Sequence, residues 1–199
     1  RRGRSSLPGP EPRPRQAWQR TTGGPITAAP ALLPDGTVVV ASQDGRLHAF
    51  AADGAARWTY ATGGKIWSSP ALSADGKTLY VGSEDHHLHA VNAATGAFRW
   101  KLELGPCPAT KRPGRDAVRC DVDASPVVAP DGTILVGGNG LFAVTPAGTL
   151  RWHFPTPRRV TSSPALRPDG TAIFGSQGKR VYAVGADGKL RWELAVKDD

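Results

Sequence analysis

The stretch YAVGADGKLRWEL at residues 182–194 decides the fold, because a counterpart, HAVNAATGAFRWKL, occupies residues 89–102. Each stretch joins two runs of apolar and polar residues through a turn that contains glycine, which is typical of a β-hairpin. The tryptophan of the second run recurs along the chain at spacings of 40, 42, 52 and 40 residues. The five tryptophans are Trp18, Trp58, Trp100, Trp152 and Trp192.

A proline and an Asp-Gly pair recur in step with these tryptophans. The Asp-Gly pair follows the proline by five residues. Its aspartate can cap a turn and its glycine can adopt a positive φ angle. The chain is therefore an internal repeat of about 40 residues with one insertion in the third unit. The prolines are Pro30, Pro70, Pro126 and Pro164, and the pairs begin at Asp35, Asp75, Asp131 and Asp169.

Each unit is predicted to form four short strands, because it contains four runs rich in β-branched and aromatic residues. In the second unit these runs are residues 66–72, 78–83, 87–92 and 98–103. Tight turns between the runs favour antiparallel pairing of successive strands. Four-stranded units repeated in this way predict an all-β propeller with radially arranged blades.

The repeat also predicts the organisation of the chain. Residues 1–15 are rich in arginine and proline and are expected to form a disordered linker, whereas residues 16–199 should form the repeats. Four units and an additional tryptophan strand at residues 16–22 indicate an arc of a larger propeller, with the remaining blades in a parent chain. The units are predicted at about 24–63, 64–105, 121–157 and 158–199, with an insertion at 106–120.

The tryptophan of the fourth strand is predicted to fill the space between neighbouring blades. A tryptophan buries about 200 Å² and can anchor one blade on the next. Trp18 and Trp192 are expected to be less covered, because they lie at the two ends of the arc. The blade-anchoring tryptophans are predicted to be Trp58, Trp100, Trp152 and Trp192.

The two hairpin sequences resemble the PQQ-like β-propeller repeat, a family named after the quinoprotein dehydrogenases. The resemblance extends over residues 18–199. The same repeat builds the propeller lipoprotein of the bacterial outer-membrane barrel-assembly machinery and propeller modules of other bacterial proteins. The resemblance implies the propeller fold, whereas function depends on the site that a given member carries.

The formal net charge of +8 is confined to two segments. Residues 1–20 carry +5 and residues 106–119 carry +3, so the rest of the chain is neutral. A nucleic-acid-binding protein should instead carry a basic stripe on its folded surface, so nucleic acid is not an expected partner. No run approaches the ~18 apolar residues of a membrane-spanning helix, so no transmembrane segment is expected.

No catalytic, cofactor-binding or metal-binding residue is predicted. A quinoprotein dehydrogenase needs calcium ligands, a catalytic aspartate and usually adjacent cysteines, and the chain has no adjacent cysteine pair. His86, His87 and His89 form the most metal-like cluster, but zinc needs three or four convergent ligands. The prediction is a non-enzymatic scaffold without a cofactor. The alternative is part of a quinoprotein dehydrogenase, or of a propeller that binds a sugar or small ligand in further blades.

Trp67 departs from the repeat, because its position holds Thr27, Asp123 and Thr161 in the other units. Exposed tryptophans are over-represented among interface hot spots, although Trp67 would also fit against a neighbouring loop. The basic residues of the insertion favour a protein partner with an acidic surface. The predicted partner-binding residues are Trp67, Lys111, Arg112, Arg115 and Arg119.

The insertion also contains both cysteines of the chain, Cys107 and Cys120. A disulfide between them would close the loop and restrict the unfolded chain. Disulfides persist in oxidising compartments, so a periplasmic or extracellular location in bacteria is predicted. Two free thiols in a cytoplasmic module of a larger protein are the alternative.

Overall fold

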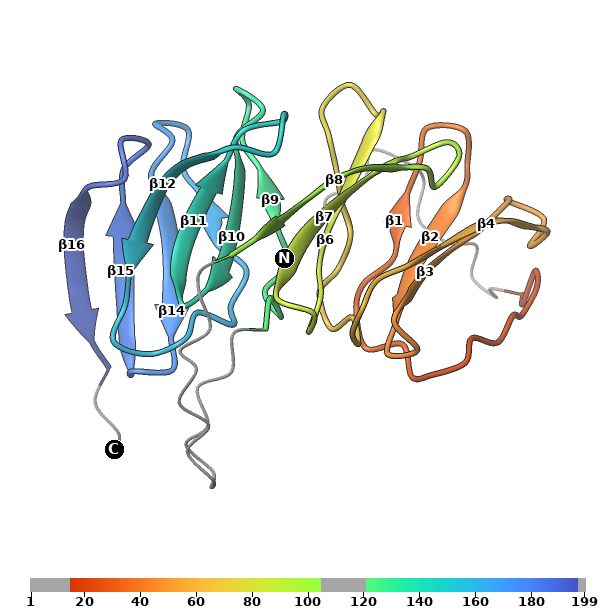
Figure 1. Cartoon of the computed structure of the whole chain (residues 1–199), viewed down its shortest axis with the longest axis horizontal. Coiled ribbons are helices and arrows are strands. Elements are labelled where there is room, and N and C mark those ends of the chain that lie inside the picture. The colour runs from red at the N-terminus through yellow and green to blue at the C-terminus, as the bar shows by residue number, and fades with distance from the viewer. Residues whose placement is uncertain (1–14, 105–120, 197–199) are drawn as a thin grey trace.

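The computed structural model describes residues 15–104 and 121–196 (Figure 1). The regular elements of this part are strands, which form four 4-stranded sheets with antiparallel pairing throughout. No helix in the described residues is long and apolar enough to cross a membrane. The predicted all-β fold with four-stranded repeats is confirmed.

Each sheet is one blade, and its strands follow one another in sequence order. Blade 1 contains β1 (Ala31–Leu32), β2 (Val38–Ser42), β3 (Arg46–Phe50) and β4 (Ala56–Ala61). Blade 2 contains β5 (Ala71–Leu72), β6 (Thr78–Gly82), β7 (His87–Asn92) and β8 (Phe98–Glu103). Blade 3 contains β9 (Val127–Val128), β10 (Ile134–Gly138), β11 (Gly140–Val144) and β12 (Leu150–Pro155). Blade 4 contains β13 (Ala165–Leu166), β14 (Ala172–Ser176), β15 (Arg180–Val184) and β16 (Leu190–Ala195).

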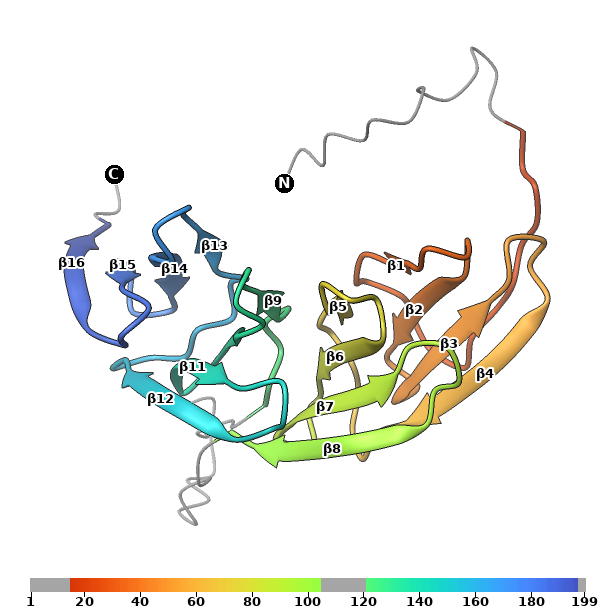
Figure 2. The ribbon, with the colours of Figure 1, turned by 90° about the horizontal axis from the view of Figure 1, so that it is seen from above.

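The four blades form an arc that is open on one side (Figure 2). The first strands, β1, β5, β9 and β13, lie on the inner side of the arc, and the fourth strands lie on the outer side. Open sheets arranged in this way correspond to part of a propeller, as the repeat count predicted.

The apolar core lies between the blades and consists of three clusters. Between blades 1 and 2, for example, Val39 and Leu47 pack with Leu79 and Val81, and these residues are fully buried. Equivalent clusters lie between blades 2 and 3 and between blades 3 and 4. Each blade therefore depends on its neighbour for the burial of its apolar face.

The recurring Asp-Gly pairs close the turns between the first and second strands. Asp35 Oδ1 accepts a hydrogen bond from the Thr37 amide at 3.0 Å, and Gly36 has a φ angle of 81°. The hydrogen bonds from Thr37 hold the pKa of the Asp35 carboxyl below its ordinary value. The same turn recurs at Asp75, Asp131 and Asp169. These carboxylates therefore have a structural role, because they cap turns.

Each docked tryptophan packs on a glycine of the third-to-fourth-strand hairpin in the following blade. Trp100 packs on Gly148, where an added Cβ would lie 2.6 Å from the indole ring. Its indole N–H donates to the Pro146 carbonyl at 2.9 Å. The tryptophan–glycine pairs are Trp18–Gly54, Trp58–Gly96, Trp100–Gly148 and Trp152–Gly188.

The two terminal tryptophans differ from each other. Trp192 is 43% exposed, and no described residue forms a glycine hairpin against it. Trp18, in contrast, is half-buried like Trp58, Trp100 and Trp152. The expectation that Trp18 would be less covered is wrong, because it docks on Gly54 and donates its indole N–H to the Ala52 carbonyl at 2.8 Å.

Candidate partner-binding face

The lower end of the arc in Figure 1 contains the turns between second and third strands and the connectors between blades. Leu104, the last described residue before the insertion, donates its amide to the His86 carbonyl at 3.1 Å. Val122, just after the insertion, donates its amide to the Ser83 carbonyl at 3.1 Å. The insertion therefore leaves and re-enters the described fold at this end. The predicted residues Cys107, Lys111, Arg112, Arg115, Arg119 and Cys120 lie outside the described residues, as does the predicted linker up to residue 14.

Trp67 lies in the connector between β4 and β5 at the same end, and it is 40% exposed. Its indole Nε1 donates a hydrogen bond to Glu84 Oε1 at 2.9 Å. Blade 1 has a different pair at these two positions, because Gln43 Nε2 there donates to Thr27 Oγ1 at 3.4 Å. Blade 2 therefore differs from blade 1 at both residues of this contact. Its pair, Glu84 and Trp67, exposes a large aromatic ring to solvent.

Glu84 also belongs to an acidic group that connects three segments of the chain. Glu84, Asp121 and Asp123 each offer a carboxylate oxygen, and these oxygens lie within 4.8 Å of one another. Arg159, from the connector between blades 3 and 4, places Nη2 at 2.8 Å from Asp123 Oδ2 and 3.8 Å from Asp121 Oδ2. We call Trp67, Glu84, His86, Asp121, Asp123 and Arg159 the lower-end cluster.

Asp121 is the most crowded carboxylate of the lower-end cluster. Burial raises the pKa of the Asp121 carboxyl above its ordinary value, because the charged form is poorly solvated. The negative charges of Asp123 and Glu84 raise it further, and the positive charge of Arg159 opposes them. The ionised form of Asp121 therefore lowers the free energy of unfolding.

His86 completes the cluster from a strained backbone position. Its φ angle is 73°, a left-handed conformation that a side chain with a Cβ adopts at a cost. The equivalent turn residue of blade 1 is Gly45, with a φ angle of 80°. The His86 Nδ1 atom lies 3.7 Å from Asp121 Oδ1. The turn of blade 2 thus carries an imidazole where blade 1 has no side chain.

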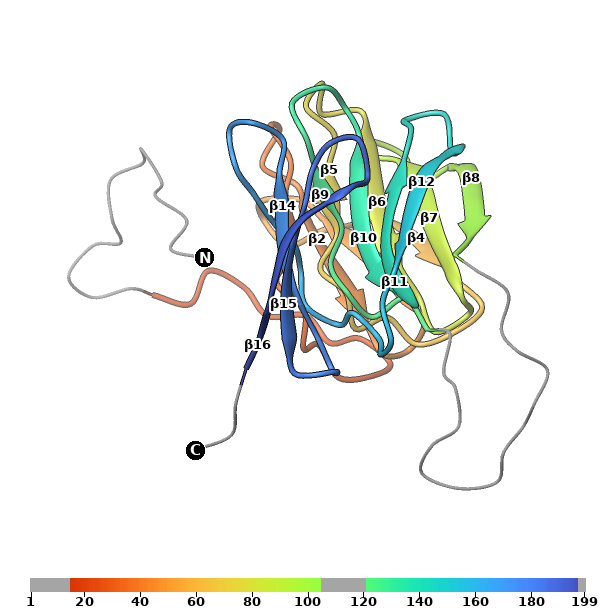
Figure 3. The same cartoon turned by 90° about the vertical axis from the view of Figure 1, so that its left-hand side faces the viewer.

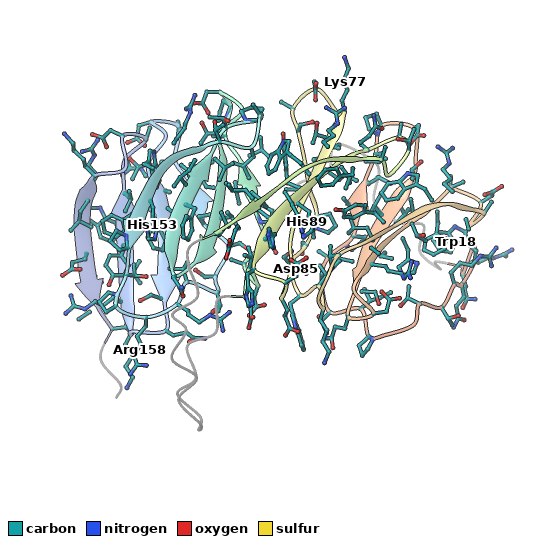
Figure 4. The ribbon with its side chains drawn as sticks, in the orientation of Figure 1. Trp18, Lys77, Asp85, His89, His153 and Arg158 are labelled. Atoms are coloured by element: carbon teal, nitrogen blue, oxygen red, sulfur yellow. The ribbon has the colours of Figure 1, made fainter. Side chains whose placement is uncertain are left out.

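The other two histidines of the predicted cluster have different surroundings. His89 is only 2% exposed, and its Nε2 lies 3.0 Å from both carboxylate oxygens of Asp85 (Figure 4). Its Nδ1 lies 2.9 Å from the Tyr60 hydroxyl of blade 1. His87 Nδ1 lies 2.6 Å from the Asp85 carbonyl oxygen. Among the described residues, these histidines belong to no group that could hold a metal ion.

Asp85 links two blades through this network. Burial opposes ionisation of Asp85, but hydrogen bonds from His89 and from the Gly63 amide at 2.8 Å outweigh it and hold the pKa of the carboxyl well below its ordinary range. Blade 1 has a similar arrangement, in which His48 Nε2 lies 2.8 Å from Asp44 Oδ2. At the equivalent positions of His48 and His89, the imidazole therefore has a structural role, because it pairs with the carboxylate of a turn.

The lower-end cluster does not fit a calcium ion of the kind that quinoprotein dehydrogenases use. Three carboxylates would suit calcium by charge and ligand type. The guanidinium group of Arg159, however, already lies against Asp121 and Asp123, and a divalent cation there would be repelled by it. The described cluster is an ion-pair network between connectors.

Sequence reasoning identified Trp67 and missed its partners. Glu84 replaces glutamine, and Asp123 occupies the threonine position of other units, so both departures from the repeat were visible in the sequence. Arg159 gave no such signal, because the equivalent connector residue in blade 2 is Lys65. The contact of Arg159 with Asp123 depends on the spatial proximity of two connectors.

The sheets, the docked tryptophans and the Asp-Gly turns define a propeller of the PQQ-like repeat class. The sequence model of one family of this class, outer membrane protein assembly factor BamB, matches residues 11–156. The chain belongs to this family, which confirms the resemblance seen in the hairpin sequences.

A solved structure also resembles the chain. The crystal structure of BamB from Moraxella catarrhalis has the same fold, with a TM-score of 0.60 and 21% sequence identity. The match covers 89% of this chain and 64% of that chain, so this chain spans less than two thirds of the BamB structure. A comparison with curated proteins gave no match.

Proposed function

We propose that the chain is a non-catalytic propeller scaffold that binds another protein through its lower end. The observation that carries this proposal is the paired replacement of Gln43 and Thr27 by Glu84 and Trp67. It places a 40% exposed indole beside the point where the insertion joins blade 3. Large aromatic side chains held by a hydrogen bond are effective anchors in protein interfaces. The family name, an outer membrane protein assembly factor, is in keeping with a binding role.

An acidic protein surface is the partner that the charges favour. The insertion contributes Lys111, Arg112, Arg115 and Arg119, with Asp116 as its single acidic residue. The acidic side chains nearby are already engaged, because Glu84 accepts from Trp67 and Asp123 pairs with Arg159. Basic residues accelerate association with an acidic partner and make it sensitive to salt.

A capture experiment tests this proposal. The tagged chain is incubated with an extract of its source cells, and the retained proteins are compared between wild type, Trp67→Ala and a variant with Arg112 and Arg115 changed to Ser. Thr161→Ala is the matched control, because Thr161 occupies the Trp67 position in blade 4. The expected result is a partner that wild type and Thr161→Ala retain and the other two variants lose. Equal retention by all four proteins would contradict the proposal.

An enzymatic role is the alternative, in which the chain forms part of a quinoprotein dehydrogenase or of a propeller that binds a sugar or small ligand. In that case the site would lie in further blades, since Arg159 occupies the cation position of the lower-end cluster. Cofactor absorbance or calcium-dependent dye reduction by the full-length protein would favour the enzyme over the scaffold.

The proposed location is periplasmic or extracellular, and it depends on the state of Cys107 and Cys120. A disulfide between them would close the insertion into one loop. Thiol titration of the unreduced, denatured protein is expected to find no free thiol. Two free thiols would instead favour a cytoplasmic module.

A further inference from the structure

A polar cavity lies between blades 2 and 3 at the upper end, opposite the lower-end cluster. Its volume is about 350 Å³, which falls in the range of small-molecule sites, about 300–1,000 Å³. The β5–β6 turn and the β9–β10 turn form two of its sides (Figure 3). Both blades have a neighbouring blade on each side within the chain, so the cavity lies in the interior of the arc (Figure 2).

Tyr80 gives this cavity a hydroxyl group that the equivalent positions of the other blades lack. Those positions hold Val39, Leu135 and Ile173. Tyr80 is only 2% exposed, and it lines the cavity together with Thr78. Burial raises the pKa of the Tyr80 hydroxyl, so this group stays neutral and can donate a hydrogen bond.

Arg99 lines the same cavity and differs from its counterparts in two other blades. Arg57 of blade 1 pairs with Asp35 of its own blade, and Arg151 of blade 3 pairs with Asp131 at 2.8 Å. Among the described residues, Arg99 forms no ion pair within 4.0 Å, and its Nη2 donates to the Lys77 carbonyl at 3.1 Å. Its guanidinium group therefore keeps donors for another acceptor.

Ser73 explains why Arg99 is left without this ion pair. The Ser73 hydroxyl donates to Asp75 Oδ1 at 2.6 Å. Hydrogen bonds from Ser73 and from the Lys77 amide hold the pKa of the Asp75 carboxyl below its ordinary value, and the charge of Arg99 contributes less. The equivalent residues of the other blades have no hydroxyl group; they are Leu33, Ala129 and Arg167.

We propose that the cavity binds a small organic acid, with Arg99 as the charged partner of the carboxylate and Tyr80 as a second donor. A guanidinium group with free N–H donors matches a carboxylate in charge and in geometry. The opposite side of the cavity is formed in part by Val128, Pro130 and Pro146. These apolar surfaces favour an acid with a compact apolar body.

This site is separate from the proposed partner-binding face, because it lies at the other end of the blades. Binding of the acid therefore does not require the protein partner. Arg99→Gln should leave the capture of that partner unchanged. The two proposals can consequently fail independently of each other.

Saturation-transfer NMR with two small probes tests the proposal on the purified protein. Benzoate is the first probe, because it combines a carboxylate with a flat apolar ring. Benzamide is the matched control, since it has nearly the same shape and no charge. We expect saturable binding of benzoate and binding of benzamide that is weaker by about tenfold or more.

Four variants, each checked for folding by circular dichroism, locate the bound probe. Arg99→Gln and Tyr80→Phe should weaken benzoate binding, by about tenfold for the loss of the charge and less for the loss of the hydroxyl. Ser73→Ala should also weaken it, because Asp75 is then free to pair with Arg99. Arg57→Gln is the matched control and should leave binding unchanged, since Arg57 has the same position in blade 1 and already pairs with an aspartate.

Three results would overturn the proposal. The first is the absence of saturable benzoate binding, and the second is equal binding of benzoate and benzamide. The third is benzoate binding that a folded Arg99→Gln protein retains in full, or that Arg57→Gln weakens to the same extent. Should Arg99→Gln fail to fold, Ser73→Ala provides the same test, because it leaves the guanidinium group in place and changes only its competitor.

Discussion

The upper turns and the lower end of the blades differ in how closely they keep to the repeat. At the upper turns, four aspartates accept the same backbone hydrogen bond next to a glycine with positive φ. At the lower end, His86 replaces a glycine and Trp67 replaces a threonine. All four blades use the same Asp-Gly turn between their first and second strands. At the lower end, in contrast, the residues differ from blade to blade.

The difference indicates which contacts the fold requires. The upper turns and the tryptophan hairpins use backbone groups and close packing, so a substitution there affects the blade itself. The lower-end cluster includes a strained turn at His86 and a crowded carboxylate at Asp121, and each of these features carries an energetic cost. Unfavourable features that persist in one region are a known property of functional sites.

The largest expected effect belongs to the regular part of the molecule. Trp100→Ala removes an indole from its hairpin and leaves a cavity between blades 2 and 3, so it should lower the free energy of unfolding by about 3 kcal/mol. Trp192→Ala, which changes the same position on an uncovered strand, should cost less than about 1 kcal/mol. Denaturant melts of the two variants at low protein concentration measure the difference, and equal losses would contradict the inter-blade role of Trp100.

The Asp85–His89 pair should give the next largest effect. Asp85→Asn weakens the charged hydrogen bonds that link blades 1 and 2, and it should cost about 2 kcal/mol at neutral pH. Because the pKa of Asp85 is lowered in the folded state, its contribution is present above the unfolded pKa and is lost as the pH falls through the folded value. Urea melts should therefore show a gap between wild type and variant that narrows on acidification.

A substitution at His86 should stabilise the protein. Glycine adopts a φ angle of 73° without the cost that a Cβ imposes, so His86→Gly should raise the free energy of unfolding by about 1 kcal/mol. The same variant removes the imidazole that faces Asp121. Thermal melts test this expectation. If His86→Gly were less stable than wild type, His86 would stabilise the fold, as the upper turns do, and the contrast between the two ends would be contradicted.

The smallest expected effect concerns Asp121. Its raised pKa means that the ionised form costs stability, so Asp121→Asn should be more stable than wild type by about 1 kcal/mol or less at neutral pH. This advantage should disappear at acidic pH, where the wild-type carboxyl is protonated. A variant that is less stable than wild type at neutral pH would show that the ion pair with Arg159 outweighs the crowding.

The sequence predicted the parts of the structure that depend on short-range order. The repeated tryptophans, the Asp-Gly turns and the four strands per unit follow from residue types at fixed spacing. Trp18 was misjudged because its partner, Gly54, lies in another segment of the chain. The contact between Arg159 and Asp123 was missed for a similar reason, because the curvature of the arc brings the two connectors together.

The central claim, that the lower end binds a partner while the upper turns support the fold, is tested most directly by site-specific cross-linking. A photo-reactive amino acid is placed at position 67, and in a second protein at position 77, because Lys77 lies at the opposite end of the blade (Figure 4). After irradiation in an extract of the source cells, we expect a distinct cross-linked partner from position 67 and none from position 77. The same partner from both positions, or from position 77 alone, would contradict the account.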